Sequence, residues 1–234
     1  MIDFHTHVLP GIDDGSRGTD MSMQMLETSY NYGIDVMVAT PHFYIRHTDV
    51  ESFLRHRKDS YRALMHKAKS RNTPIPDIRL GAEVFYFTGI SALEDLDKLC
   101  IEGTKYLLLE MPFMEWSEKV IAEVEKIVYD RSITPIIAHL DRYLAFQAHN
   151  DYVMDLIRLG AVIQMNGDYV NGLFTRKNAI SLIEDEVVNL LGSDCHNMQK
   201  RAPNLDKTFS IIRRKCGQEV LDRIDSCGRR ILNL

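Results

Sequence analysis

Short apolar runs alternate with longer amphipathic stretches along the whole chain. The runs that have the length and composition of strands cover residues 2–8, 35–40, 78–85, 106–111, 135–139, 162–166 and 187–193. Most of them are nearly continuous in apolar residues, which is typical of parallel strands covered on both faces. Seven such strands separated by helices predict an α/β fold with right-handed crossovers.

The intervening stretches carry apolar positions at helical spacing and have recognisable helix ends. Thr19 is placed to cap a helix that Gly33 would close, and Thr48 with Glu51 has the spacing of a capping box. Further apolar stripes predict a helix after Ser117 and a helical C-terminal part. The chain contains no internal repeat, low-complexity tract or linker, so we expect a single domain over residues 1–234.

The positions of the polar residues distinguish a barrel from an open, doubly wound sheet. Acidic residues and histidines lie at or just after the C-terminal ends of nearly all the expected strands. In a barrel these ends surround one mouth, whereas the outer strands of an open sheet end too far apart to share a site. The sequence therefore favours a barrel.

Two pairs of residues, each with a spacing of two, indicate a metal site. His5 and His7 stand two positions apart in the first apolar run, so both side chains would lie on the same face of a strand. Asp194 and His196 repeat this spacing after the last strand. Cys195 lies between them, and we expect its side chain to point to the opposite face and pack in the core.

Two carboxylates strengthen this interpretation. Glu83 follows a Gly-Ala pair, and Glu110 lies inside an apolar run that ends at Met111, where an unpaired carboxylate is expensive to bury. Other candidates at strand ends are Asp13, Asp14, His42 and His139. Each alone could be a hydrogen-bonded core or turn residue. Together they favour a cluster of imidazole and carboxylate ligands without thiolate, which suits manganese, iron or zinc.

Composition narrows the function classes. A net charge of −5 disfavours a surface that binds nucleic acid. The four cysteines show no C-x-x-C spacing and read as free thiols in a reducing compartment. The N-terminus does not resemble a secretion signal, and no apolar run approaches ~20 residues. We therefore expect a cytoplasmic protein without membrane insertion.

Seven short motifs carry a family resemblance. They are His5-Thr6-His7, Asp13-Asp14-Gly15, Ala39-Thr40-Pro41-His42, Gly81-Ala82-Glu83, Leu109-Glu110, Ala138-His139-Leu140-Asp141-Arg142 and Gly192-Ser193-Asp194-Cys195-His196. In this order they resemble the polymerase-and-histidinol-phosphatase (PHP) superfamily. Within it, the chain is most similar to the bacterial manganese-dependent protein-tyrosine phosphatases of capsule and exopolysaccharide biosynthesis. The resemblance extends over residues 2–201 and implies a distorted, TIM-like (β/α)7 barrel.

The resemblance also implies three divalent metal ions at the C-terminal ends of the strands, with Mn²⁺ preferred and Fe or Zn as alternatives. Carried over by position, the ligands are His5, His7, Glu83 and Asp194 for the first ion, Glu83, Glu110 and His139 for the second, and Asp14, His42 and His196 for the third. Arg142 and Arg201 match the arginines that grip phosphate. A cysteine route is disfavoured, because Cys195 lies between candidate ligands.

The implied activity is hydrolysis of phosphotyrosine in proteins by a metal-bridging hydroxide. The implied substrate is the tyrosine-rich tail of a bacterial tyrosine kinase that controls polysaccharide synthesis. The alternatives are a small-molecule phosphomonoesterase such as histidinol phosphatase, a nuclease, and a non-catalytic binding module. Aromatic residues that follow the ligands would line an aryl slot or pack under loops: Phe43, Tyr44, Phe85, Tyr86, Phe113, Trp116, Tyr143 and Tyr169.

Overall fold

Parallel strands and helices alternate in the computed structural model, which describes residues 1–149 and 151–234. The strands are β1 (Ile2–Thr6), β2 (Val36–Ala39), β3 (His42–Phe43), β4 (Asp77–Leu80), β5 (Glu83–Phe85), β6 (Tyr106–Glu110), β7 (Thr134–Ile137), β8 (Val162–Asn166) and β9 (Leu190–Gly192). The α-helices are α1 (Thr19–Asn31), α2 (Val50–Arg71), α3 (Glu118–Arg131), α4 (Tyr152–Arg158), α5 (Gly167–Asn171), α6 (Arg176–Glu184), α7 (Leu205–Cys216) and α8 (Gln218–Ile231). Short 3-10 helices cover η1 (Ile90–Ala92), η2 (Leu96–Leu99) and η3 (Leu140–Arg142).

The strands form a distorted barrel made of two parallel sheets. One sheet has the order β1-β2-β4 and the other the order β3-β5-β6-β7-β8-β9. On one side the chain itself joins them, because β2 continues into β3 and β4 into β5; on the other side β1 meets the segment after β9, where Asp194 N donates to His5 O at 2.8 Å. The strands therefore follow one another around a ring in chain order, as the alternation of strands and helices predicts.

One of the seven expected strands is broken in the structure, and a short strand that was not expected, β3, follows β2. The expected strand at 78–85 is divided into β4 and β5, and β2 continues past Pro41 into the short β3. Proline has no backbone N–H, so it interrupts the hydrogen-bond ladder at this point. Each break transfers its strand from the first sheet to the second, which is why the barrel is distorted.

The helix ends differ slightly from the expected ones. Thr19 is the first residue of α1, and Gly18 occupies the cap position. Asp49, rather than Thr48, caps α2, because its side chain accepts a hydrogen bond from Ser52 N at 2.8 Å. Ser117 precedes α3 as expected.

The interior of the barrel is apolar at its base. The side chains that fill it are Ile2, Phe4, Val36, Val38, Ile101, Leu108, Ile136, Ala138 and Leu190, together with Ile231 and Leu232 from the C-terminal end. Leu108 and Glu110 stand two residues apart in β6, so they share the inward face. The same face thus changes from apolar at the base to polar at the C-terminal end of the strands, here called the barrel mouth.

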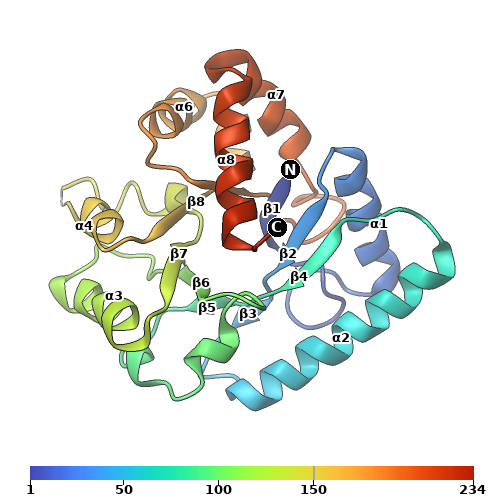
Figure 1. The fold of residues 1–234 in the computed structure, drawn as a ribbon, viewed down its shortest axis with the longest axis horizontal. Coiled ribbons are helices and arrows are strands. Elements are labelled where there is room, and N and C mark those ends of the chain that lie inside the picture. Colours follow the sequence, from blue (N-terminus) through green and yellow to red (C-terminus); the bar gives the residue numbers. More distant parts are fainter. Residues whose placement is uncertain (150) are drawn as a thin grey trace.

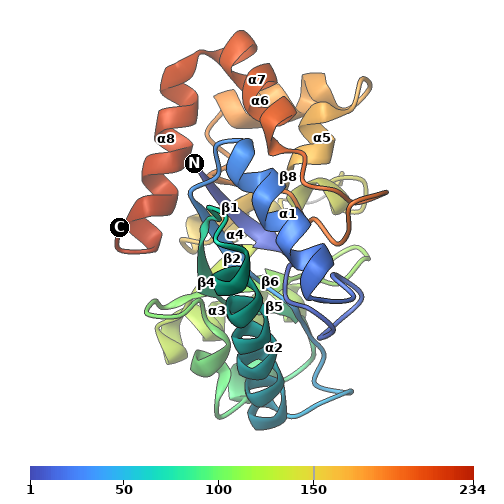
Figure 2. The ribbon, with the colours of Figure 1, turned by 90° about the vertical axis from the view of Figure 1, so that its right-hand side faces the viewer.

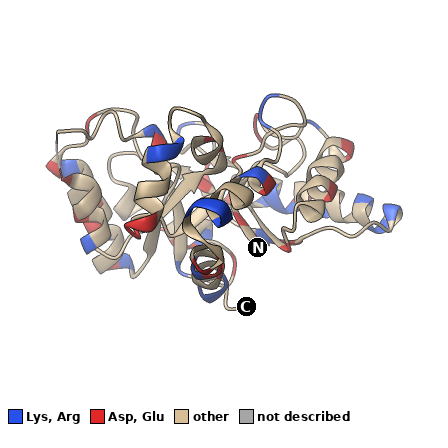
Figure 3. Ribbon diagram, turned by 90° about the horizontal axis from the view of Figure 1, so that it is seen from above, with Lys and Arg blue, Asp and Glu red and all other residues tan. Residues whose placement is uncertain are grey.

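Helices surround the strands on all sides. Figure 1 shows α1 and α2 on one flank, α3 and α4 on the other, and α8 crossing in front of β1. Figure 2 shows that both chain ends lie beside α8. Basic and acidic residues are interspersed along the outer helices (Figure 3). Within the described ranges, none of the helices has the length and apolar character needed to cross a bilayer.

Close packing of α8 on β1 predicts the effect of one substitution. A Cβ atom at Gly228 would lie 2.5 Å from Phe4 Cε2 and 3.2 Å from Ile2 Cδ1. Gly228→Ala should therefore lower the free energy of unfolding by about 1–2 kcal/mol, although alanine is the better helix former. Chemical denaturation would measure this, with the exposed Ser226→Ala on the same helix as control. Equal stability of the two variants would show that α8 does not pack tightly on the barrel.

Candidate metal centre

The structure gathers every candidate ligand at the barrel mouth. Each of the nine side chains has a nitrogen or carboxylate oxygen within 3.6 Å of a partner in the same cluster, here called the ligand cluster: His5, His7, Asp14, His42, Glu83, Glu110, His139, Asp194 and His196. Seven of them are buried, and His42 is partly buried. The side chain of Asp14 is 69% exposed. Residues from the first strand to the last thus share one site.

Glu83 lies at the centre of the ligand cluster. Its Oε2 atom is 3.2 Å from His5 Nε2, 3.3 Å from His7 Nε2 and 2.7 Å from His42 Nδ1. Its Oε1 atom is 2.9 Å from His139 Nε2. One carboxylate, only 1% exposed, therefore faces four imidazole rings.

The ligand cluster cannot satisfy its own polar atoms. Glu83 Oε2, Glu110 Oε2 and His196 Nε2 are buried without a hydrogen bond of acceptable geometry. His5 Nε2 and His7 Nε2 lie 3.1 Å apart. With metal–nitrogen distances of about 2.1 Å, two ligand atoms on one ion are separated by about 3 Å. Donor atoms that converge on shared points instead of on each other fit divalent cations.

Three groups of ligand atoms are close enough to hold an ion, since all atoms within a group lie within 4.8 Å of one another. The groups are His5, His7 and Glu83; His7, Asp14, His42 and His196; and His42, Glu83 and Glu110. The first and second overlap the sets implied for the first and third ions. The last contains His42 where the resemblance implies His139, although His139 Nε2 is also 3.4 Å from Glu110 Oε1.

Outer hydrogen bonds orient the histidine rings. His7 Nδ1 lies 2.7 Å from Asp13 Oδ2, and His5 Nδ1 lies 3.3 Å from Gln164 Oε1. In both rings the Nε2 atom consequently faces the centre, which is the usual arrangement of metal-binding histidines. Asp13 also accepts a hydrogen bond from His42 N at 3.1 Å. Of the Asp13-Asp14 pair, Asp13 thus supports the rings and Asp14 contacts His42 and His196.

Two polar residues of β8, Gln164 and Asn166, belong to the site although the sequence did not lead us to predict them. Gln164 Oε1 accepts a hydrogen bond from His139 N at 2.6 Å, and Gln164 Nε2 donates to Asn166 Oδ1 at 3.0 Å. Asn166 Nδ2 in turn donates to Asp194 Oδ2 at 3.0 Å. Their spacing of two in an otherwise apolar strand is a signal that could have identified them, since it places both on the inward face.

The backbone is strained where two ligands leave their strands. His139 has φ = +32° and Asp194 has φ = +52°, in the left-handed region that non-glycine residues rarely adopt. Such conformations persist where surrounding contacts enforce them, and they are common at functional sites. The bond from His139 N to Gln164 is one of these contacts.

Asp194 connects the ligand cluster to two arginines. Its Oδ1 atom lies 3.4 Å from His7 Nε2. Its Oδ2 atom accepts a hydrogen bond from Arg142 and forms an ion pair with Arg201 at 2.6 Å. Both arginine side chains are 35% exposed. The two guanidinium groups therefore converge at the edge of the mouth, from segments far apart in the sequence.

The charges of the ligand cluster are strongly coupled. Burial lowers the pKa of His139, but hydrogen bonds to Glu110 and Glu83 outweigh this effect and raise its pKa to about 9. Burial raises the pKa of Glu83, yet the charge of His5 and the hydrogen bond from His139 hold it well below its usual range. Ionised carboxylates thus face positive charge, as they do when divalent cations replace these protons.

Cys195 is not a nucleophile candidate. It is fully buried and packs in the largest core cluster, as expected from its position between two inward-facing residues. Burial raises the pKa of its thiol, whereas a reactive cysteine needs a lowered pKa.

The aromatic residues divide into two sets. Phe43, Trp116 and Tyr143 are buried in the core, so they pack under the mouth and do not line it. Phe113 is 45% exposed, and its ring lies 6.0 Å from that of His139 at an interplanar angle of 18°. Tyr44 lies 5.2 Å from His42, also measured between ring centroids. Aromatic surface therefore borders the ligand cluster.

Comparisons with known proteins place the chain among capsule-synthesis proteins. The family model described as capsular polysaccharide synthesis, CpsB/CapC, matches residues 1–230. Tyrosine-protein phosphatase CpsB of Streptococcus agalactiae is 28% identical over 228 residues, covering 94% of this chain and 92% of its own length. Tyrosine-protein phosphatase YwqE of Bacillus subtilis is 26% identical over 232 residues, covering 94% and 87%.

Solved structures support the fold. A structure described as YwqE from Bacillus subtilis and CpsB from Streptococcus pneumoniae, unique metal-dependent tyrosine phosphatases, matches with a TM-score of 0.86 and 22% identity, covering 100% of this chain and 95% of that one. A phosphotriesterase homology protein from Escherichia coli, with phosphate in its active site, matches with a TM-score of 0.56 and 13% identity over 97% of both chains. The distorted barrel is thus the fold of these proteins.

The outer hydrogen bond to His7 predicts a change in metal affinity. Asp13→Asn should weaken Mn²⁺ binding by about 10- to 100-fold, because the amide no longer fixes the tautomer and charge of His7. Isothermal titration calorimetry would measure it. Asp20→Asn, an exposed surface carboxylate, serves as control. Unchanged affinity of Asp13→Asn would mean that His7 is not a ligand or needs no support.

Proposed function

We propose that this chain, which belongs to the CpsB/CapC family of capsular polysaccharide synthesis, is a metal-dependent phosphatase that hydrolyses phosphotyrosine in proteins. The observation that carries the proposal is the buried ligand cluster, whose unsatisfied donor atoms converge beside two arginines. The names of relatives that are 26–28% identical over most of the chain support the same activity. Residues 1–234 would act as one phosphatase domain.

The ligands would hold up to three divalent ions, with Mn²⁺ preferred and Fe or Zn as alternatives. We assign His5, His7, Glu83 and Asp194 to the first ion, Glu83, Glu110 and His139 to the second, and Asp14, His42 and His196 to the third. When bound, such ions supply positive charge next to phosphate and lower the pKa of water to about 7. The residues contribute by presenting deprotonated nitrogen and oxygen atoms in fixed orientations.

Arg142 and Arg201 would bind the phosphate group. A guanidinium group has a planar fork of donors that matches two phosphate oxygens at once. Asp194 Oδ2 holds both groups at the edge of the mouth, next to the candidate ligands. Because the arginines are positioned before substrate arrives, they can neutralise charge that develops on the phosphate oxygens with little reorganisation.

Phosphotyrosine fits this site better than an alkyl phosphate. Phenol has a pKa of about 10, so tyrosinate can leave with little help from a general acid. Asp141, a nearby carboxyl group, is half-buried and accepts a hydrogen bond from Asn166 N at 3.0 Å, so it has a structural task already. The exposed ring of Phe113 offers a stacking surface for an aryl group. A small-molecule phosphatase such as histidinol phosphatase is less well supported.

The natural substrate we propose is the tyrosine-rich tail of a bacterial tyrosine kinase in capsule synthesis. The family description and the resemblance of the motifs support this choice. A cytoplasmic location is consistent with it, because all four cysteines are free, as in a reducing compartment.

Peptide hydrolysis tests the proposed function directly. The Mn²⁺-loaded protein should release phosphate from a phosphotyrosine peptide, and excess chelator should abolish this activity because the ligand cluster cannot activate water alone. Turnover of the matched phosphoserine peptide and of histidinol phosphate should be at least tenfold slower. Equal or faster turnover of either compound would contradict the assignment to tyrosine, and inert metal-loaded protein would contradict a phosphatase.

The proposed role of Arg142 and Arg201 predicts how lysine substitutions change the activity. Arg142→Lys and Arg201→Lys should each lower kcat/KM by about 10- to 100-fold, because lysine keeps the charge but loses the two-point contact. Arg158→Lys on α4, where Arg158 is exposed and paired with Asp155, is the matched control. Elemental analysis should show unchanged metal content in all three. Lysine variants as active as wild type would remove the arginines from the phosphate site.

A further inference from the structure

An aromatic layer lies directly outside the ligand cluster. β3 and β5 are parallel, with His42 opposite Glu83. Tyr44 and Phe85 each stand two residues further along, so they follow these ligands on the same face. Their ring centroids are 5.6 Å apart. The strand register itself therefore places an aromatic pair next to the candidate metal centre.

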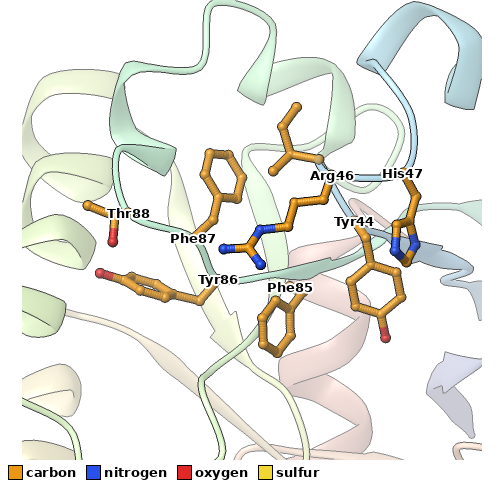
Figure 4. Close-up of a pocket in the computed structure, with 8 residues that line it drawn as sticks. Tyr44, Arg46, His47, Phe85, Tyr86, Phe87 and Thr88 are labelled. Carbon is orange, nitrogen blue, oxygen red and sulfur yellow. The ribbon is translucent and has the colours of Figure 1, made fainter.

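This aromatic pair forms one wall of a cavity of about 510 Å³. Phe87 lies on the other side, and the side chain of Arg46 extends between Phe87 and Phe85 with its guanidinium group facing the space (Figure 4). A second hollow, lined by His42 and Asp14, shares Tyr44 with this cavity. The volume is within the ~300–1,000 Å³ typical of ligand pockets. The cavity therefore adjoins the ligand cluster and is large enough for a bulky side chain.

The positive charge of Arg46, together with the aromatic walls, indicates what kind of ligand the cavity can bind. Arg46 is exposed and has no ion pair or hydrogen bond to any described residue. An arginine without a carboxylate partner is ready to bind an anion through two parallel hydrogen bonds. Rings of Phe and Tyr favour an aryl group between them. A ligand that satisfies both requirements is aromatic and anionic.

We propose that this cavity binds a second phosphotyrosine of the same peptide while the first occupies the candidate metal centre. The inference rests on the proposed function and specifies the class of substrate: peptides with two phosphotyrosines close in sequence. The second aryl ring packs against Phe85 and Phe87, and its phosphate pairs with Arg46. Because the two sites share Tyr44, a short peptide can reach both.

Peptides with one hydrolysable group isolate this second contact. Each carries a single phosphotyrosine and, two to four residues away, either phosphonomethyl-phenylalanine, tyrosine, glutamate or alanine. The phosphonate mimics phosphotyrosine but is not hydrolysed, so phosphate release reports only the first site. Steady-state KM and kcat are measured on the Mn²⁺-loaded full chain, its Arg46→Gln variant, and Arg214→Gln on the outer helix α7 as control.

For wild type we expect the phosphonate peptide of the best spacing to have a KM about five- to tenfold below that of the alanine peptide, with similar kcat, as for one charge-assisted contact. Arg46→Gln should remove most of this preference, and Arg214→Gln should keep it. Three results would overturn the second site alone. The first is an equal KM for the phosphonate and alanine peptides at every spacing. The others are a preference for tyrosine or glutamate as strong as that for phosphonate, and an undiminished preference for phosphonate in Arg46→Gln. Failure to hydrolyse any of the peptides would overturn the proposed function, and the second site with it.

Discussion

Burial of Glu83 among imidazole rings is the constraint on which the rest of the structure depends. A carboxylate that is removed from water needs compensating positive charge or hydrogen bonds. Here one oxygen is within 3.3 Å of three histidine nitrogens, yet it accepts no hydrogen bond of acceptable geometry. Protons on the rings can offset the charge in part, but only a cation can use all the converging lone pairs. The mouth is therefore built around ions that the chain must acquire.

The barrel meets this constraint by separating two environments along one interior face. The base is filled by apolar side chains and is covered by the C-terminal residues Ile231 and Leu232. One or two residues further along the strands, the same face presents acids and histidines. Gln164 and Asn166 connect the two sides of the mouth through a chain of hydrogen bonds from His139 to Asp194. Apolar packing thus fixes the strands, and the polar network fixes the ligands.

Asp194 connects the ligand cluster to the two arginines that we propose bind phosphate. One of its oxygens faces the histidines and the other contacts both arginines, so the ligand cluster and the arginine pair share a single carboxylate. The aromatic pair Tyr44 and Phe85 lies outside the ligand cluster, where the proposed substrate would place an aryl ring. The strand period places the aromatic pair, because side chains two residues apart on a strand share a face, whereas the two arginines come from segments that follow β7 and β9.

The sequence alone was sufficient to predict most of the strands, the barrel and the candidate ligands. Apolar runs mark buried strands whatever their partners are, and acids and histidines at strand ends are conspicuous because they are costly to bury. His5 and His7 needed only the strand period to be placed on one face. The choice of Asp14 over Asp13 came from resemblance to a family, because two adjacent carboxylates are equivalent in sequence.

Tertiary structure decided what depends on partners distant in the chain. The fold of the segment after β1 brought Asp13 to His7, and Gln164 and Asn166 joined the site through contacts with His139 and Asp194, partners that their spacing in the sequence does not specify. The breaks at Pro41 and Gly81 emerged only when two sheets had to close into one ring. The meeting of Arg142 and Arg201 at Asp194 likewise required the closed barrel. Residue type and period are local properties, whereas convergence is a property of the fold.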